Sequence, residues 1–262
     1  MGDTWVSLHV ERRGDGPPLV LLHGGVGSSN HWVRNIDVFA EHFSVYAVDL
    51  PGLGRSPDVP RDISREDYLD VCTRGIEAHL PPGEPVRLVG FSYGGVIGSH
   101  VAGELGDRLE RVSLISPGGL RQLRGGEPRY LKMPPEDAPK NEIDKVVRHN
   151  LLQLMLHHPE SISDETIALH CENVRNSRFH SRNLSVRISL LENLRRIGAP
   201  LQVLLGEHDT VLYPSHEERI RTMRMAAPHL RLDMIPGAGH WMQYERSETV
   251  NRVLLEFLTE GL

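Results

Sequence analysis

The sequence contains few cysteines, and they form no recognisable pattern. Cys72 and Cys171 are its two cysteines, and neither belongs to a Cys-x-x-Cys or a Cys/His arrangement. This spacing argues against a disulfide framework and a zinc site, and it predicts two reduced structural thiols. The histidines show no ligand spacing either, so we expect no metal and no cofactor.

Long hydrophobic runs are also missing. No run approaches the roughly 20 apolar residues that a transmembrane helix requires. The first residues, Met1 to Trp5, hold no basic stretch followed by an apolar one, and Val6 stands where a myristoylation signal needs serine or threonine. We predict a soluble, cytoplasmic protein with no membrane partner.

Basic residues do not outnumber acidic ones. The chain has 29 Lys and Arg against 35 Asp and Glu, a formal net charge of -6. Nucleic-acid-binding proteins usually present a basic face, so we do not expect nucleic acid as a partner. A small-molecule substrate is the expected partner, and a homo-oligomer stays open.

Short apolar runs alternate with longer amphipathic stretches along most of the chain. This pattern predicts an α/β fold, a mostly parallel sheet with helices on both faces. Helices are expected after Ser64, which resembles an N-cap, and from Ser247 through Phe257. The predicted core strands are Leu19 to Leu22, Val45 to Val48, Val86 to Val89, Val112 to Ile115, Leu201 to Leu205 and Leu232 to Ile235.

The alternation fails between residues 118 and 196. A stretch rich in glycine, proline and charge precedes helical patterns over Val146 to Leu156 and Ser163 to Val174. We therefore predict a core of residues 1–117 and 197–262 and a helical cap of residues 118–196. Such a cap would lie over the carboxyl ends of the strands, where open α/β sheets bind ligands.

The sharpest motif is Gly90-Phe91-Ser92-Tyr93-Gly94, which follows a predicted strand and precedes a predicted helix. In a Gly-x-Ser-x-Gly elbow the two glycines allow a tight turn that exposes the serine hydroxyl above the sheet. The helix N-terminus after the serine favours a developing negative charge. An ordinary glycine-rich turn is the alternative. The context favours Ser92 as a nucleophile.

A serine nucleophile needs a base, and the base needs an acid to orient it. Asp209 follows one late strand and His240 follows the next, which gives the order Ser, Asp, His. Glu207, two residues before Asp209, is a competing acid, and a structural turn histidine is the alternative reading of His240. The sequence predicts Ser92, His240 and Asp209 as a catalytic triad.

A glycine-rich loop, His23 to Ser29, follows the first predicted strand. Such a loop brings backbone N–H groups close to a tetrahedral oxyanion, and we predict that Gly25 and Tyr93 donate the two hydrogen bonds. A phosphate-binding loop is the alternative, but the Gly-Lys-Ser/Thr that it requires does not follow.

These motifs resemble the α/β-hydrolase superfamily across nearly the whole chain. The resemblance depends on their order and spacing: His23-Gly24-Gly25, the stretch Asp49 to Ser56, the elbow at Ser92, then Asp209 and His240. A serine at the elbow differs from the epoxide hydrolases and haloalkane dehalogenases, whose nucleophile is an aspartate.

The segment Gly239 to Glu245 resembles the meta-cleavage-product hydrolases, which cut carbon–carbon bonds in ring-fission diketones. Those enzymes tend to carry an asparagine before the nucleophile, where this chain has Phe91, and a cap arginine that binds the substrate. The resemblance implies Arg178 or Arg182 for that role, with a solvated face as the alternative. Phe91 and Trp241 are predicted to bind substrate.

Two enzyme hypotheses and one binding hypothesis follow. The first is a serine hydrolase of small carboxylic esters or related acyl compounds, which works through an acyl-enzyme. The second is carbon–carbon hydrolysis of a ring-fission diketone. The third is a ligand receptor that keeps the pocket and the triad but turns over very slowly.

Overall fold

The computed structural model describes residues 7–120, 130–181, 184, 187–211 and 215–262. Within this part of the chain a seven-stranded sheet has the order β1-β3-β2-β4-β5-β6-β7. All neighbouring strands are parallel except β1, which is antiparallel to β3. The strands are β1 Val10–Arg13, β2 Pro18–Leu22, β3 Ser44–Val48, β4 Val86–Phe91, β5 Leu109–Ile115, β6 Leu201–Gly206 and β7 Arg231–Ile235.

All six predicted strands are confirmed, and β1 was not predicted. Its sequence, Val10 to Arg13, is mostly charged, and it lies half-exposed at the edge of the sheet. Charged side chains on an edge strand discourage pairing with other chains, but they also hide the strand from a search for apolar runs.

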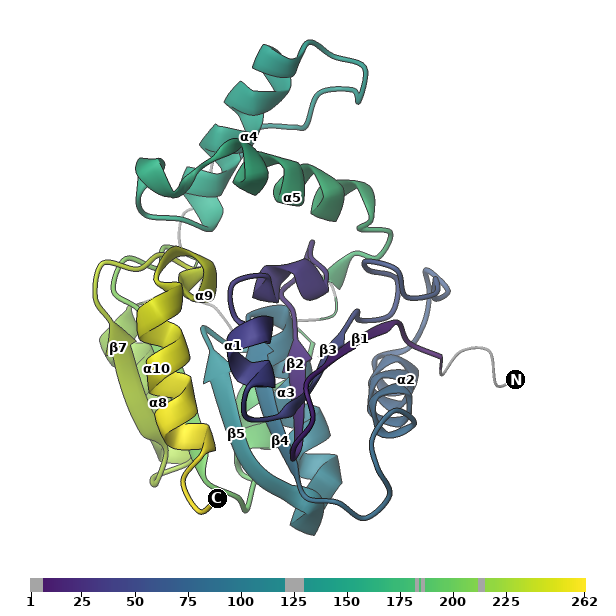
Figure 1. Cartoon of the computed structure of the whole chain (residues 1–262), viewed down its shortest axis with the longest axis vertical. Coiled ribbons are helices and arrows are strands. Elements are labelled where there is room, and N and C mark those ends of the chain that lie inside the picture. Colours follow the sequence, from purple (N-terminus) through teal and green to yellow (C-terminus); the bar gives the residue numbers. More distant parts are fainter. Residues whose placement is uncertain (1–6, 121–129, 182–183, 185–186, 212–214) are drawn as a thin grey trace.

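Side chains along each central strand alternate between two apolar layers. On β2, Leu19 and Leu21 belong to one buried cluster, whereas Val20 and Leu22 belong to the other. Helices cover both faces (Figure 1). One face packs against α2 Arg65–Glu77, α3 Tyr93–Leu105, α7 Leu190–Leu194 and α8 His216–Ala226, and the other against α1 Ile36–Ala40 and α10 Ser247–Leu258.

Local signals explain where several helices begin. Ser64 caps α2 by accepting a hydrogen bond from the Asp67 N–H (3.0 Å), and Ser163 caps α5 (Asp164–Arg175) in the same way through Thr166. Both predicted helices, and α10, are confirmed. The short elements η2 Ser29–Trp32, η3 Gly106–Arg108, η4 Pro159–Ser161 and α9 Met242–Glu245 complete the description.

The segment between β5 and β6 is helical where it is described. It contains α4 (Lys140–Leu154), η4, α5 and α7. We call residues 130–181 the cap segment, because α4 and α5 lie over one end of the sheet (Figure 1). By contrast α7, within the predicted cap boundaries, packs on α3 and α8 of the core.

The strand order creates a topological switch point at the carboxyl ends of β2 and β4. From β2 the chain goes on to β3 on one side, whereas β4, which pairs with β2 on the other side, continues the sheet in the opposite direction. Ligands of open α/β sheets bind at such a switch point. Gly25 follows β2 and Ser92 follows β4, so the fold brings these two predicted site residues together. No described helix is long and apolar enough to cross a membrane.

Candidate active site

Ser92 lies at a sharp turn between β4 and α3. Its backbone has φ +52° and ψ −110°, a conformation that non-glycine residues rarely adopt. A side chain on Gly90 would overlap the carbonyl oxygen of Gly94, and one on Gly94 would overlap the carbonyl oxygen of His23. Both glycines are therefore required by close backbone approach, as the motif predicted, and the Ser92 side chain remains partly exposed.

His240 lies between Ser92 and Asp209. Its Nδ1 is 2.8 Å from Asp209 Oδ2, and its Nε2 is 2.9 Å from Ser92 Oγ. A carboxylate only accepts hydrogen bonds, so Nδ1 carries the proton and Nε2 accepts from the serine hydroxyl. The loops after β4, β6 and β7 thus place a hydroxyl, an imidazole and a carboxylate in one hydrogen-bonded chain.

The pKa of Asp209 is set by opposing effects. Burial raises it, but attraction to His240 and hydrogen bonds from His240 and the Val211 N–H (3.0 Å) outweigh burial and lower it below the ordinary value of 3.8. Asp209 is therefore ionised at neutral pH and can stabilise a positive charge that develops on His240.

Glu207, the competing acid, faces elsewhere. Its Oε2 accepts a hydrogen bond from the Gly237 N–H (2.8 Å), and about half of its side chain is exposed. Glu207 therefore fixes the backbone of the loop that leads to His240, whereas Asp209 contacts the imidazole itself.

The predicted oxyanion donors lie next to each other. A Cβ on Gly25 would be 3.6 Å from the Cβ of Tyr93. Tyr93 is the first residue of α3, so its N–H has no acceptor within that helix. Gly25 and Tyr93 thus lie side by side, and the donation of their N–H groups to an oxyanion stays a prediction.

Two buried histidines hold the loop that contains Gly25. His23 donates from Nδ1 to the Gly24 carbonyl oxygen (2.7 Å) and accepts from the Leu50 N–H at Nε2 (2.9 Å), while His31 Nδ1 accepts from the Gly24 N–H (3.2 Å). Burial is the main cause that lowers the pKa of both rings. Both rings are therefore neutral supports of the loop.

Phe91 and Trp241, the two aromatic residues predicted to bind substrate, are buried. The Phe91 ring centroid is 5.0 Å from that of His240. The Trp241 indole donates to the His31 carbonyl oxygen (3.0 Å) and stacks on Tyr244. Phe91 therefore packs on the base, whereas Trp241 packs on His31 and Tyr244, and contact of either side chain with substrate stays a prediction.

All three guanidinium nitrogens of Arg178 donate hydrogen bonds, mostly to a loop of the core. They donate to the carbonyl oxygens of Gly54 (2.9 Å) and Ser56 (2.6 Å), to that of Asn176, and to the carboxylate of Asp58. This arrangement attaches the cap segment to the core and uses four of the five N–H groups of Arg178. Arg182, the other predicted cap arginine, lies outside the described residues.

A cavity of about 260 Å³ touches His240. Gly239, Thr210 and His208 line its core side, and its cap side is lined by Leu152, Leu154, Met155, Leu156, His157 and Pro159. The wall is mainly apolar on the cap side, so the cavity can take a small apolar group beside the imidazole.

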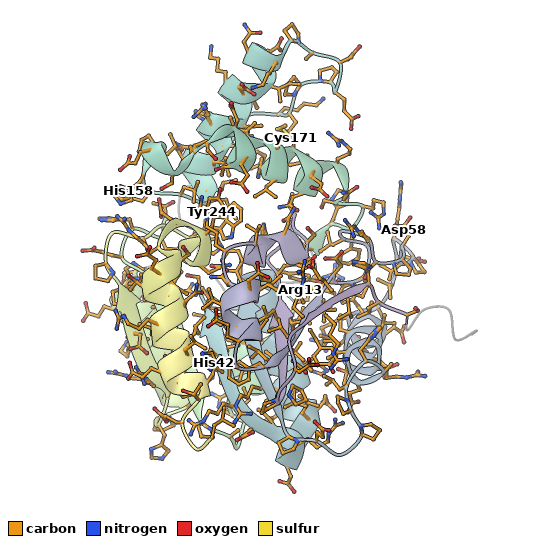
Figure 2. All side chains as sticks on the ribbon, viewed as in Figure 1. Arg13, His42, Asp58, His158, Cys171 and Tyr244 are labelled. Atoms are coloured by element: carbon orange, nitrogen blue, oxygen red, sulfur yellow. The ribbon has the colours of Figure 1, made fainter. Side chains whose placement is uncertain are left out.

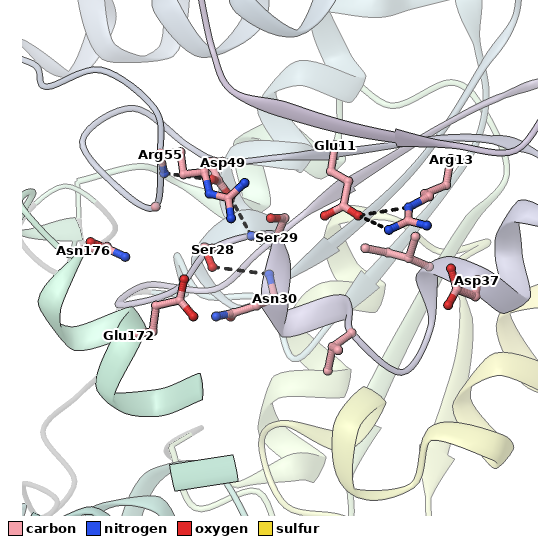
Figure 3. A pocket seen from close by; sticks show the side chains of 13 residues that line it. Glu11, Arg13, Ser28, Ser29, Asn30, Asp37, Asp49, Arg55, Glu172 and Asn176 are labelled. Atoms are coloured by element: carbon pink, nitrogen blue, oxygen red, sulfur yellow. Dashed lines mark hydrogen bonds and ion pairs between the residues drawn. The ribbon is translucent and has the colours of Figure 1, made fainter. Parts of the chain in front are cut away.

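A second cavity, of about 250 Å³, lies away from the triad (Figure 3). Its wall is polar and includes Ser28, Asn30, Asp49 and Arg55 of the core and Glu172 of the cap segment. Asp49 accepts hydrogen bonds from the Ser29 N–H (2.6 Å) and the Arg55 N–H (2.9 Å), which explains the Asp49 to Ser56 motif as a brace between two loops.

The cysteines and the possible metal ligands can be checked in the described part of the chain. No group of three His, Cys, Asp or Glu side chains there could hold a metal ion. Cys72 and Cys171 are free thiols, as predicted, and burial raises the pKa of each.

Some supporting residues could not be found from the sequence motifs. Arg219 of α8 is buried and donates to the Pro117 carbonyl oxygen (2.8 Å). Burial lowers its pKa to about 10, and attraction to Asp209 opposes this shift. The carboxylate of Glu245 binds the backbone beside His240. The isolated charges of these residues in amphipathic helices look like solvated positions, and only the tertiary structure shows their burial.

The comparisons with known proteins agree with this fold. Residues 19–253 match the model of the alpha/beta hydrolase family, and the chain belongs to this family. A 2-hydroxy-6-oxononadienedioate/2-hydroxy-6-oxononatrienedioate hydrolase of Comamonas testosteroni is 26% identical over 97% of the chain and 92% of the relative. An uncharacterised carboxylesterase, nap, of Bacillus subtilis (strain 168) is 25% identical over 96% of the chain and 83% of the relative.

A solved structure supports the same fold. The meta-cleavage product hydrolase CumD of Pseudomonas fluorescens IP01 covers 97% of the chain with 95% of its own length, at a TM-score of 0.78 and 21% identity. The α/β-hydrolase fold and the resemblance to meta-cleavage-product hydrolases, both predicted from the motifs, are confirmed.

Proposed function

We propose that this chain is a serine hydrolase that cleaves small carboxylic esters or related acyl compounds. The observation that supports it is the hydrogen-bonded chain from Ser92 Oγ through His240 to Asp209, with distances of 2.9 and 2.8 Å. A general base within such reach of a hydroxyl can take its proton as the hydroxyl attacks. Here Ser92 is the nucleophile, His240 the base and Asp209 the acid that orients the base.

The reaction proceeds in two displacements. Ser92 Oγ bonds to the substrate carbonyl carbon while its proton passes to His240 Nε2, and the oxyanion accepts hydrogen bonds from the Gly25 and Tyr93 N–H groups. The carbon–oxygen bond to the alcohol then breaks, and His240 returns the proton to the leaving oxygen. Water, deprotonated by His240, cleaves the acyl-enzyme and regenerates Ser92.

We place the leaving group in the cavity beside His240, which Ser92 and the predicted oxyanion donors do not line. The leaving group must lie near the imidazole to receive its proton, and the adjoining cavity is about 260 Å³ with a partly apolar wall. Short-chain nitrophenyl esters are therefore suitable probes. The division into a core and a helical cap of residues 118–196 also stays part of this proposal.

A second candidate is hydrolysis of a carbon–carbon bond in a ring-fission diketone. It is favoured by two relatives named as hydrolases of such compounds, 26% and 27% identical to this chain, and by the segment Gly239 to Glu245. It is disfavoured by Phe91, which stands before the nucleophile, and by the engagement of Arg178 with the core.

A substrate panel tests the proposal. Short-chain nitrophenyl esters and ring-fission dienones are compared by kcat/KM, and the pre-steady-state time course with the ester is recorded. A burst of product followed by sustained turnover, with kcat/KM higher for esters, is expected. Preference for dienones would replace the ester proposal by the second candidate, and a burst without turnover would indicate a ligand receptor.

A further inference from the structure

Glu245 joins the cap segment to the loop that carries His240. Its carboxylate is buried, with 8% of the residue exposed. Oε1 accepts hydrogen bonds from the N–H groups of His157 (2.8 Å) and His158 (2.7 Å), and Oε2 accepts from the Gly239 N–H (2.6 Å). Two of these donors belong to the cap segment, and the third immediately precedes the base.

The two backbones also touch directly at this point. The Trp241 N–H donates to the Met155 carbonyl oxygen (2.7 Å), and a Cβ on Gly239 would lie 2.8 Å from the His157 nitrogen. The residues before and after His240 are therefore both attached to residues 155–158. Figure 2 shows His158 and Tyr244, the neighbour of Glu245, where the cap segment meets the core.

A carboxylate suits this position for chemical reasons. Its oxygens only accept hydrogen bonds, and bonds from backbone N–H groups to an ionised acceptor are stronger than neutral ones. Glutamine has the same shape, but its NH₂ group would face a backbone N–H in place of one oxygen. A buried donor would then lose its acceptor, and the backbone would have to move.

We propose that Glu245 is a positioning residue that holds the His240 loop at a fixed position relative to the cap segment. A substrate bound between cap and core then meets the imidazole at the distance that proton transfer requires. Glu245 touches neither substrate nor reacting atoms. This inference rests on the proposed function, because it takes His240 as the base.

The test compares Glu245→Gln with a control that loses one buried hydrogen bond elsewhere in the core. Misplacement of a reacting group by about 1 Å costs up to roughly 100-fold in rate. We expect Glu245→Gln to lower kcat for a nitrophenyl ester by about 10- to 100-fold while KM changes by less than about threefold. Asn193→Ala is the control: it removes a buried hydrogen bond to Ser99 (2.9 Å) between α3 and α7, away from the triad.

The outcomes separate a positioning role from a structural one. The inference is supported if Tm falls by a similar amount in Glu245→Gln and Asn193→Ala while kcat is lowered in Glu245→Gln alone. Equal kcat in the two variants, or a loss carried by KM, overturns it. If Glu245→Gln yields no folded protein, we expect the same result from Glu245→Asp. The aspartate side chain is one methylene shorter, so its carboxylate lies farther from the three N–H groups.

Ser92→Ala in the same assay separates this inference from the proposed function. If Ser92→Ala is inactive and Glu245→Gln keeps the kcat of the wild type, the inference fails and the proposed function stands. If Ser92→Ala retains the turnover of the wild type, the proposed function fails and the inference fails with it.

Discussion

The carboxyl ends of the strands and the cap segment use their charged side chains in different ways. At the strand ends, the carboxylate of Asp209 contacts His240, which faces a partly exposed Ser92 hydroxyl. In the cap segment, the guanidinium of Arg178 binds backbone carbonyl oxygens of the core and no part of the triad. The difference suggests that chemistry belongs to the strand ends, whereas the described cap arginine attaches the cap.

The largest effect is expected at the nucleophile. Ser92→Ala should abolish turnover of nitrophenyl esters, since loss of a triad member typically costs on the order of 10⁴-fold or more in rate. The fold should persist, because the small alanine side chain fits the elbow. Circular dichroism and steady-state kinetics check both expectations.

A covalent probe provides the control for this prediction. A fluorophosphonate should label the wild type once, and peptide mapping should place the adduct on Ser92. An adduct on another residue would contradict the assignment of Ser92 as the nucleophile at the carboxyl end of β4.

The next largest effect is expected at the acid. Asp209→Asn should lower kcat by roughly 10³- to 10⁴-fold, because an amide no longer fixes the His240 tautomer or stabilises its charged form. Glu207→Gln is the matched control, two residues away and also a loss of one carboxylate. It should cost less than about tenfold, since Glu207 binds the Gly237 N–H and not the imidazole. Equal losses in the two variants would leave the acid unassigned.

The same contrast explains what the sequence could predict. Ser92, Asp209 and His240 follow strands that are short apolar runs bounded by glycine, and parallel strands bring their carboxyl ends to one edge. The order of the motifs along the chain and the turn chemistry thus predicted their meeting without any side-chain detail. The fold class and six of the seven strands in the described sheet followed from the same alternation.

The remaining features depend on contacts that no local pattern encodes. Strand β1 is charged because it lies at an edge, and Arg219 and Glu245 are buried charges that resemble solvated ones in the sequence. The direction of Arg178 depends on how the cap segment docks on residues 54–58. Helix docking is set by long-range packing, so the sequence identified cap arginines but could not say which of them faces the site.

An intermediate effect is expected for the cap arginines. Arg178→Gln should lower the free energy of unfolding by about 1 to 2 kcal/mol, because it removes charge-assisted bonds of a partly exposed group. It should leave the preference between carboxylate-bearing and neutral substrates unchanged. Urea unfolding and paired kcat/KM measurements check this.

Arg182→Gln is the comparison variant, and it tests the original prediction for the cap. If Arg182 binds an anionic substrate, its replacement should lower kcat/KM for carboxylate-bearing substrates by about one to two decades and spare neutral nitrophenyl esters. A change of preference in Arg178→Gln instead would contradict the attachment role that we assign to Arg178.

The smallest effect concerns the pH dependence of the free energy of unfolding, to which the buried His31 contributes. Burial, followed by repulsion from neighbouring histidines, holds the pKa of His31 well below 6.5. At a pH between the lowered pKa of His31 in the folded chain and the ordinary value of 6.5, the unfolded chain binds a proton that the folded chain does not. Stability therefore falls as the pH drops below about 6.5. One such group contributes about 1.4 kcal/mol per pH unit. His23 acts in the same direction, because burial also lowers its pKa.

His31→Asn separates this contribution from the rest of the protein. The asparagine side-chain oxygen can still accept from the Gly24 N–H, but it does not titrate in this range. The unfolding free energy, measured in urea at pH 7, 6 and 5, should therefore fall less steeply in His31→Asn, by about 1.4 kcal/mol per pH unit below pH 6.5. His42→Asn, at an exposed position, should keep the slope of the wild type. Identical slopes in all three proteins would show that His31 is protonated in the folded state, and the Gly24 N–H would then lack the acceptor that holds the loop beside Ser92.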